Sequence, residues 1–353
     1  MKKNYRAAII GCGMIAAEHA KMYAEHEQTE LIALADIHPD HLKKFSEKWG
    51  IPGQSTYTDH ISLLKNEKID LVSVCTWHGS HAEISIDCAE KGIPGIICEK
   101  PMATSLGEAK KMLLAAKNNK VKLTVEHTRR YKYDSIKARE LIGSGVIGKV
   151  QAIHVRTQGG MLNWATHLID QVRYLLGDPE MEWTFGQIER KTDRYERLEP
   201  AEDRAMGIIC FSNGARMILE SDLPKPGLES GNNKPVVYGT TGQIFVGPKL
   251  RMLNGEGWHE YEPPMESERG GLLAHTDELI HWMEGDTDSH RCSGEQAIKD
   301  IEIMMSIYES ARSKNIVLSP LLVRDNPLKE MLKNGDLPVM IPGEYDFRYP
   351  YWE

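Results

Sequence analysis

A glycine-rich segment near the start of the chain has the residue types and spacing of a turn that holds a pyrophosphate. The segment is Gly11-Cys12-Gly13-Met14-Ile15-Ala16, a G-x-G-x-x-A pattern between an apolar run and an amphipathic stretch. Gly11 permits a tight turn, Gly13 lets the backbone approach the anion, and Ala16 lets the next helix pack closely. We therefore predict a dinucleotide site here, with Met14 and Ile15 beside the cofactor.

An acidic residue at the end of the second apolar run indicates which dinucleotide binds. Asp36, followed by Ile37, is placed to accept hydrogen bonds from the adenosine ribose hydroxyls. A carboxylate about 4 Å from a 2′-phosphate costs about 4 kcal/mol at an effective dielectric near 20. That energy corresponds to a roughly thousandfold preference for NAD over NADP. We predict NAD as the cofactor rather than NADP, with Asp36 and Ile37 in its site.

The elements that position this turn alternate between β-branched runs and amphipathic stretches. Strands are predicted at 5–10, 31–36, 71–76, 95–98 and 122–126, and helices at 14–26, from Pro39, at 80–91 and at 105–117. Alternation at this spacing predicts a doubly wound parallel sheet, so residues 1–127 are predicted to form a Rossmann domain of α/β class.

The pattern changes after residue 127, where strands cluster together. They are predicted at 150–156, 181–189, 205–211, 215–221, 236–238 and 243–246, with helices at 134–142, 165–176, 272–283 and 295–313. This predicts an α+β domain over 128–320 on a largely antiparallel open sheet. Residues 321–353, rich in proline and aromatic side chains, are predicted to be a tail docked on the protein surface.

Composition excludes several classes of protein. The 353 residues hold 43 Lys+Arg against 51 Asp+Glu, a net charge of −8 without a basic stripe, so we expect no nucleic-acid partner. No apolar run approaches the ~18 residues that span a bilayer, so we expect no membrane partner. Six cysteines without a C-x-x-C pair indicate a reduced, cytoplasmic protein. The spacing of the histidines His78, His81 and His127 matches no zinc pattern, so we predict no metal.

Three further segments, taken with the glycine-rich turn, resemble the glucose–fructose oxidoreductase / inositol 2-dehydrogenase / MocA family. They are Cys75-Thr76-Trp77-His78-Gly79-Ser80-His81, Glu99-Lys100-Pro101, and the stretch from Gly159-Gly160 to His167-Leu168-Ile169-Asp170. The resemblance covers essentially the whole chain to about residue 320. It implies that the cofactor also contacts Thr76, Trp77, His78, His81, Glu99 and Lys100.

The resemblance implies catalytic roles for two residues. Oxidising a secondary alcohol requires a hydride acceptor and a base for the hydroxyl proton. His167, with a reference pKa of about 6.5, suits the base, and Lys100 suits the stabilisation of a developing alkoxide. Where the family usually has Asp, this chain has Asn163, which is also placed in the catalytic set. We hypothesise that His167 is therefore a weaker base, which leaves Lys100 a larger share of proton transfer.

The predicted substrate contacts are Lys100, Arg129, Asn163, Trp164, His167 and Asp170. Alternatives stay open for three of these residues. Arg129 pairs either with a substrate anion or with a linker carboxylate, and Asp170 binds either a substrate hydroxyl or surface charge. Trp164 either stacks on a pyranose face or belongs to the core.

The sequence thus predicts an NAD-dependent oxidoreductase acting on a ring hydroxyl or ketone of a sugar, glycoside, sugar acid or cyclitol. One alternative is redox-neutral chemistry through a transient keto-sugar, as in a glycosidase or epimerase. Another is a non-catalytic NAD-binding sugar sensor. Trp183 and Phe185 would lie on the open face of the second sheet. A homodimer or homotetramer through that sheet is therefore expected.

Overall fold

The computed structural model describes residues 3–222, 234–264 and 270–346. The chain divides into two compact units. The first contains residues 1–103, 108–128 and 269–297, and the second contains 104–107, 129–268 and 298–353. Residues 269–297, which the sequence analysis assigned to the second domain, thus belong to the first unit.

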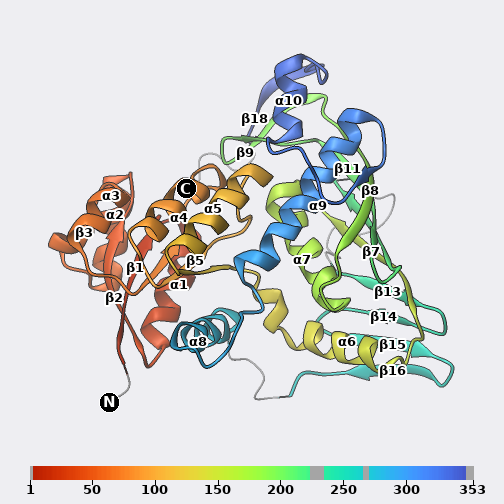
Figure 1. Ribbon diagram of the computed structural model, residues 1–353, viewed down its shortest axis with the longest axis horizontal. Coiled ribbons are helices and arrows are strands. Elements are labelled where there is room, and N and C mark those ends of the chain that lie inside the picture. The colour runs from red at the N-terminus through yellow and green to blue at the C-terminus, as the bar shows by residue number, and fades with distance from the viewer. Residues whose placement is uncertain (1–2, 223–233, 265–269, 347–353) are drawn as a thin grey trace. The chain divides into compact units, whose positions relative to one another are not determined.

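The first unit is built on a six-stranded parallel sheet in the order β3-β2-β1-β4-β5-β6 (Figure 1). This is the strand order of dinucleotide-binding folds, whose ligands lie at the carboxyl ends of the strands. Strands β4 and β5 are buried along their whole length, as parallel strands covered on both faces must be. The bounds are β1 (Tyr5–Ile10), β2 (Thr29–Ala35), β3 (Thr56–Tyr57), β4 (Leu71–Val74), β5 (Gly95–Cys98) and β6 (Lys122–Val125).

Helices connect these strands. They are α1 (Met14–Glu25), α2 (Pro39–Trp49), α3 (His60–Asn66), α4 (His81–Glu90) and α5 (Leu106–Asn118), with the short helices η1 (Gly53–Ser55) and η2 (His78–Ser80). Pro39 begins α2 because its missing N–H would have no partner in the first turn. A later helix, α8 (Gly271–Glu284), joins the same core, where Leu279 and Ile280 pack with Tyr23 and Met22 of α1. This packing explains why residues 269–297 belong to the first unit.

The second unit contains a nine-stranded sheet in the order β16-β15-β14-β13-β7-β12-β11-β8-β17. Only β7 and β12 pair in parallel among these described neighbours, so the sheet is largely antiparallel. The predicted fold class is therefore confirmed for both units. The bounds are β7 (Val150–Thr157), β8 (Met181–Glu189), β11 (Arg204–Phe211), β12 (Arg216–Ser221), β13 (Val236–Gly239), β14 (Gln243–Phe245), β15 (Leu250–Asn254), β16 (Gly257–Tyr261) and β17 (Val317–Leu318).

The helices that lie wholly or mostly in the second unit are η3 (Thr128–Tyr131), α6 (Tyr133–Ser144), η4 (Met161–Ala165), α7 (Thr166–Leu175), α9 (Gly294–Ser313) and α10 (Pro327–Asn334). Helix α9 packs tightly on the sheet because two glycines leave room for Ile307. A Cβ on Gly186 or on Gly207 would lie 2.8 or 2.9 Å from the Ile307 side chain. The inner face of the sheet is thus covered, and its outer face carries exposed Phe185 and Met206.

Residues 321–346 form α10 and a strand, β18 (Ile341–Asp346). Leu328 and Met331 are buried, and β18 pairs in parallel with β9 (Thr192–Glu196), next to β10 (Glu199–Pro200). The predicted tail thus begins with regular structure. The aromatic residues from 347 onward lie outside the described residues.

Two properties of the described residues bear on the class of protein. All six cysteines are described, all are buried, and none of them forms a disulfide. No described helix combines the length and the apolar character that crossing a membrane requires.

Candidate active site

The glycine-rich turn joins β1 to α1 and lies against the end of β4. Gly11 has a φ of +93°, and a Cβ there would lie 2.8 Å from the backbone of Cys75 and Thr76. Only glycine fits such a close approach in this conformation. A Cβ on Gly13 would meet nothing within 4 Å among the described residues, so space is open at the start of α1. The N–H groups of a helix start beside open space form an anion site.

Asp36 follows β2 directly and is fixed by the backbone on both sides. Its Oδ2 accepts a hydrogen bond of 2.6 Å from the N–H of Cys12, and its Oδ1 accepts one of 2.7 Å from the N–H of His38. A carboxylate has about four acceptor positions, so two remain for other donors. Asp36 therefore sits beside the glycine turn with capacity to bind the ribose hydroxyls.

The residues at this edge fit a dinucleotide. Three apolar side chains around the turn are exposed to solvent: Met14 by 72%, Ile15 by 40% and Ile37 by 76%. All three were predicted as cofactor contacts, and a bound dinucleotide would cover apolar surface at this place. Open space, helix N–H groups and a fixed carboxylate thus occur together within the first unit.

The loop after β4 is held by His81, the first residue of α4. Its Nδ1 lies 2.8 Å from the carbonyl of Pro101, and its Nε2 lies 3.0 Å from the carbonyl of Thr76. Because both partners are acceptors, both bonds form together only in the imidazolium form. His81 is 1% exposed and His78 is 2% exposed. These two predicted cofactor residues support the loop from inside, whereas Thr76 and Trp77 are only half-buried.

Glu99, directly after β5, points inward. His19 of α1 donates through Nε2 to Glu99 Oε1 at 3.1 Å, and the N–H of Lys100 donates to Oε2 at 3.2 Å. Behind it, His19 Nδ1 lies 2.9 Å from the hydroxyl of Ser73, which lies 2.7 Å from that of Tyr23. The predicted cofactor residue Glu99 thus anchors the backbone of Lys100.

Electrostatics keep Glu99 ionised. Burial alone would raise the pKa of Glu99, but the hydrogen bond and charge of His19, with the charge of Lys100, hold that pKa below its usual value. A buried carboxylate therefore lies beside Lys100, which is itself half-buried. The peptide bond between Lys100 and Pro101 is cis.

In the second unit, two glycines turn the chain from β7 into helix. Gly159 and Gly160 have φ values of +98° and +82°. The π-helical turn η4 comes next, and the Gly160 carbonyl accepts hydrogen bonds from the N–H groups of Trp164 and Ala165, both at 3.2 Å. The rings of Trp164 and His167 lie 5.8 Å apart at the start of α7. π-Helical turns are rare and occur frequently at functional sites.

Asn163 lies within this π-helical turn and is 1% exposed, whereas His167 is half-buried. Regular helix begins at Thr166, one residue after the predicted start at 165, so Asn163 precedes it within the π-helical turn.

Asp170 forms an ion pair with an arginine. It is 1% exposed and binds Arg130 Nε at 2.7 Å, while Arg130 Nη2 also binds Asp178 at 2.9 Å. These ion pairs hold Asp170 within the second unit, and its contact with a substrate hydroxyl stays a prediction. Arg129 donates to Gln171 at 3.1 Å. Burial lowers the pKa of Arg129, and the charges of Asp134 and Asp170 oppose that change.

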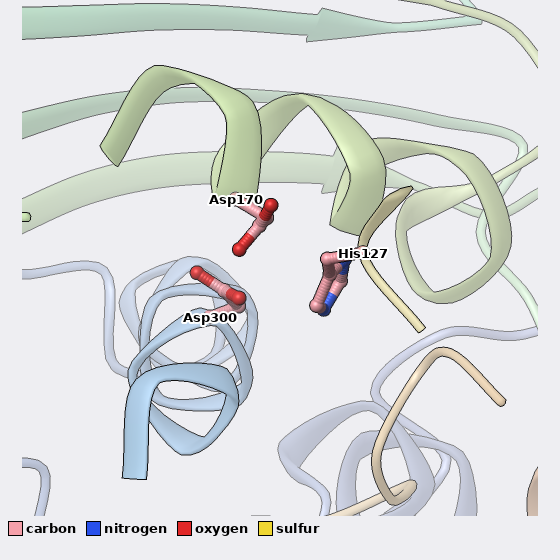
Figure 2. A group of neighbouring side chains, drawn as sticks. All are labelled: His127, Asp170 and Asp300. Atoms are coloured by element: carbon pink, nitrogen blue, oxygen red, sulfur yellow. The ribbon is translucent and has the colours of Figure 1, made fainter. Parts of the chain in front are cut away.

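A second buried carboxylate faces Asp170. Asp300 of α9 and Asp170 of α7 point toward one another (Figure 2). Arg173 binds Asp300 at 2.8 Å, and both side chains are 1% exposed. Burial raises the pKa of Asp300 to about 7, with Arg173 opposing the rise and the charge of Asp170 adding to it. Asp300 thus holds a proton in weakly acidic solution.

Several supporting residues were missed by the sequence analysis. They are His19, Tyr23 and Ser73 around Glu99, and Glu202, Asp222 and Tyr308 near the Gly159 turn. His19 carried one usable signal, because a histidine on the apolar face of α1 requires a buried polar partner. The others carry no local pattern.

Two family models match the chain. One, described as the oxidoreductase family with an NAD-binding Rossmann fold, matches residues 5–127. The other, described as the C-terminal alpha/beta domain of the oxidoreductase family, matches residues 139–318.

Individual proteins are similar over most of their length. The chain is 27% identical over 255 residues to a myo-inositol 2-dehydrogenase of Thermotoga maritima, covering 68% of this chain and 75% of the relative. It is 28% identical over 246 residues to a D-glucoside 3-dehydrogenase of Escherichia coli, covering 61% and 69%. A solved levoglucosan dehydrogenase in complex with NADH superposes with a TM-score of 0.77 at 22% identity, covering 91% of this chain and 100% of that one. The last likeness shows the fold.

The buried pair of carboxylates gives a prediction for stability. The pKa of Asp300 is raised from an ordinary 3.8 to about 7 on folding. The folded state therefore binds more protons than the unfolded state between these values, so the free energy of unfolding falls as pH rises from about 4 to about 7. The asparagine of Asp300→Asn has no titratable proton, so this variant should lack the part of the fall in unfolding free energy that Asp300 causes. Urea unfolding at pH 5 and at pH 8 measures this free energy for the wild type and the variant.

Asp336→Asn is the control, because Asp336 is exposed and that variant should behave as the wild type does at both pH values. Parallel changes in the wild type and Asp300→Asn would contradict the prediction.

Proposed function

Because the chain belongs to the glucose–fructose oxidoreductase / inositol 2-dehydrogenase / MocA family of oxidoreductases, we propose that it is an NAD-dependent dehydrogenase of a carbohydrate or cyclitol. Its reaction is the interconversion of a ring hydroxyl and a ketone. The names of the two relatives, a myo-inositol and a D-glucoside dehydrogenase, support this substrate class.

The single observation that carries the proposal is the position of Lys100. Lys100 and Glu99 come after β5, Asp36 after β2, and Gly11 after β1, so all lie at the carboxyl edge of one parallel sheet. Ligands of such sheets bind at this edge, where the strand order reverses between β1 and β4. An ammonium group on this edge is suited to act on an oxygen at the reacting carbon, which supports the role proposed for Lys100.

The chain's own residues then account for orientation and for the proton. NAD, when bound, supplies a hydride acceptor at nicotinamide C4. Lys100 binds the substrate oxygen and stabilises the negative charge that develops on it. His167 accepts the hydroxyl proton, which balances the loss of hydride from the adjacent carbon. The neutral amide of Asn163 can orient a group but cannot take a proton.

We also propose that two copies of the chain pair through the outer face of the nine-stranded sheet. Phe185, Ile208 and Ile218 are opposite one another across β8, β11 and β12, and they point away from α9. Phe185 is 40% exposed and Met206 is 43% exposed. A contiguous apolar patch on a soluble protein is typical of an interface, and homodimers are its commonest form.

Loss of either proposed catalytic group should abolish most turnover. With a panel of sugars, sugar acids, glycosides and inositols, we expect His167→Ala to lower kcat by about 10²–10⁴-fold, because general base catalysis is worth that much. Lys100→Ala should lower kcat at least as far. The measurement is NADH absorbance together with product analysis. His259→Ala, on the hairpin of β16, is the control and should retain wild-type kcat.

The panel separates the alternatives. Conversion of a glycoside by NAD-loaded protein without net NADH would indicate the redox-neutral reaction. Binding of NAD and sugar without any turnover would indicate a sensor. Undiminished kcat in both variants would contradict the proposed roles.

Cofactor choice depends on Asp36. We expect the wild type to bind NAD about a thousandfold more tightly than NADP, because the fixed carboxylate repels a 2′-phosphate. Asp36→Ala should reduce that ratio by at least about tenfold, and Asp40→Ala, four residues further in exposed helix, should leave it unchanged. Titration calorimetry with both nucleotides measures the ratio. Equal Kd values for the wild type would overturn the assignment.

Pairing through the outer face of the nine-stranded sheet predicts the mass of the protein in solution. Light scattering should find at least twice the 39.9 kDa of one chain. Phe185→Arg should lower the mass to that of a monomer, because it buries a charge in an apolar interface. Leu322→Arg is the control, because Leu322 is 86% exposed and lies outside the sheet. A monomeric wild type would refute the pairing.

A further inference from the structure

The backbone of the Gly159 turn is bound by two carboxylates that no motif includes. The N–H of Gly159 donates to Asp222 Oδ1 and the N–H of Gly160 to Asp222 Oδ2, both at 2.9 Å. The next N–H, of Met161, donates to Glu202 Oε1 at 2.7 Å. Successive N–H groups that point to one side form an anion-binding concavity. Here the chain's own acidic side chains fill it.

Asp222 is held from several sides. It comes directly after β12, its N–H binds the Thr157 carbonyl at 2.9 Å, and its Oδ2 accepts from the Ser221 hydroxyl at 3.0 Å. Arg194 of β9 lies 3.5 Å from the same oxygen. The carboxylate of Asp222 therefore has little freedom to move away from the turn.

Glu202 is fixed from the other side. It is fully buried, and the hydroxyl of Tyr308 in α9 donates to its Oε2 at 2.6 Å. Burial raises the pKa of Glu202, while the hydrogen bonds from Tyr308 and Met161 and the charge of Arg194 oppose the rise. The turn is thus tied to β12 through Asp222 and to α9 through Glu202.

The position of the turn fixes the rings that come after it in the chain. A Cβ on Gly159 would lie 2.3 Å from Cδ1 of Trp164, so the indole packs directly on that glycine. The Trp164 ring then lies 5.8 Å from the His167 ring at an interplanar angle of 55°. A path of direct contacts therefore leads from Asp222 through Gly159 and Trp164 to His167.

We propose that Asp222 is a positioning residue for His167, acting through the Gly159–Gly160 backbone and the Trp164 ring. This inference rests on the proposed function for the role of His167 as the base. Asp222 itself contacts neither substrate nor cofactor in this scheme. A carboxylate is required because each of its two oxygens accepts a hydrogen bond from a backbone N–H group. In an asparagine, the amide nitrogen would face one of these backbone donors and could not accept its hydrogen bond.

The variant Asp222→Asn tests the proposal. We expect kcat to fall at least about tenfold, because small displacements of a catalytic group are costly. The acid limb of the kcat/KM profile should shift by about half a pH unit or more, because it reports the base of the free enzyme. The Kd for NAD should stay within about twofold of the wild type, since the nucleotide residues lie in the first unit. Glu256→Gln, an 83% exposed carboxylate, is the matched control with no change.

A second measurement does not need substrate. Titration of the His167 imidazole by NMR, assigned with His167→Gln, should give a different midpoint in Asp222→Asn than in the wild type. If no panel substrate is oxidised by the wild type, the proposed function fails while this measurement still decides the positioning role. Unchanged kcat and an unchanged midpoint in a folded Asp222→Asn would overturn the proposal.

If Asp222→Asn does not fold, Gly160→Ala decides instead. A Cβ on Gly160 would lie 3.5 Å or more from its neighbours, so an alanine there would not clash. It would instead strain the backbone of the turn, because Gly160 has a φ of +82°. A shifted His167 midpoint is expected, and an unshifted one would refute the positioning role.

Discussion

Carboxylates that accept hydrogen bonds from backbone N–H groups fix three of the loops that carry candidate chemistry. Asp36 binds the glycine turn through Cys12, Glu99 binds the N–H of Lys100, and Asp222 binds Gly159 and Gly160. Hydrogen bonds to charged groups contribute about 1.5–3 kcal/mol each, roughly twice the neutral kind. Because these hydrogen bonds hold backbone groups rather than side chains, they fix the backbone conformation of each of the three loops.

These carboxylates need compensation, since an isolated buried charge is strongly unfavourable. Glu99 receives it from His19 and Lys100, and Glu202 from Tyr308 and two backbone donors. Asp170 and Asp300 are matched by Arg130 and Arg173, with burial raising the pKa of Asp300 so that it holds a proton more readily. Each loop therefore depends on groups from other elements, which couples local geometry to the packing of the whole unit.

Features that depend on local pattern could be predicted from the sequence. The alternation of strands and helices indicated the parallel sheet, and Gly11 and Asp36 were located because a turn glycine and a strand-end acid have fixed spacing. Lys100 and His167 could be proposed only through the family resemblance, since a lone lysine or histidine has no distinctive spacing. The family itself is confirmed by both matched domains.

Features that depend on tertiary contact could not be predicted in this way. Asp222 binds glycines 62 and 63 positions earlier, and nothing near Asp222 indicates that pairing. Strands β15 and β16 were missed because polar residues such as Arg251 and Glu260 interrupt their apolar pattern, although they pair as neighbours. The return of α8 to the first unit depends on packing against Tyr23, which periodicity alone does not reveal. The π-helical turn likewise follows two glycines whose N–H groups bind the distant Asp222, a contact that no local pattern indicates.

The same turn gives a physical reason for Asn163. We hypothesised from the sequence that His167 is a weaker base because position 163 has no carboxylate. Asn163 is 1% exposed, and Glu202 already binds the N–H of Met161 two residues before it. An aspartate at 163 would add a buried charge to a turn whose N–H groups already bind the acidic side chains of Asp222 and Glu202, with like-charge repulsion added to desolvation. A neutral amide avoids both costs, while Asp222 and Trp164 supply the orientation that a carboxylate at 163 would otherwise give.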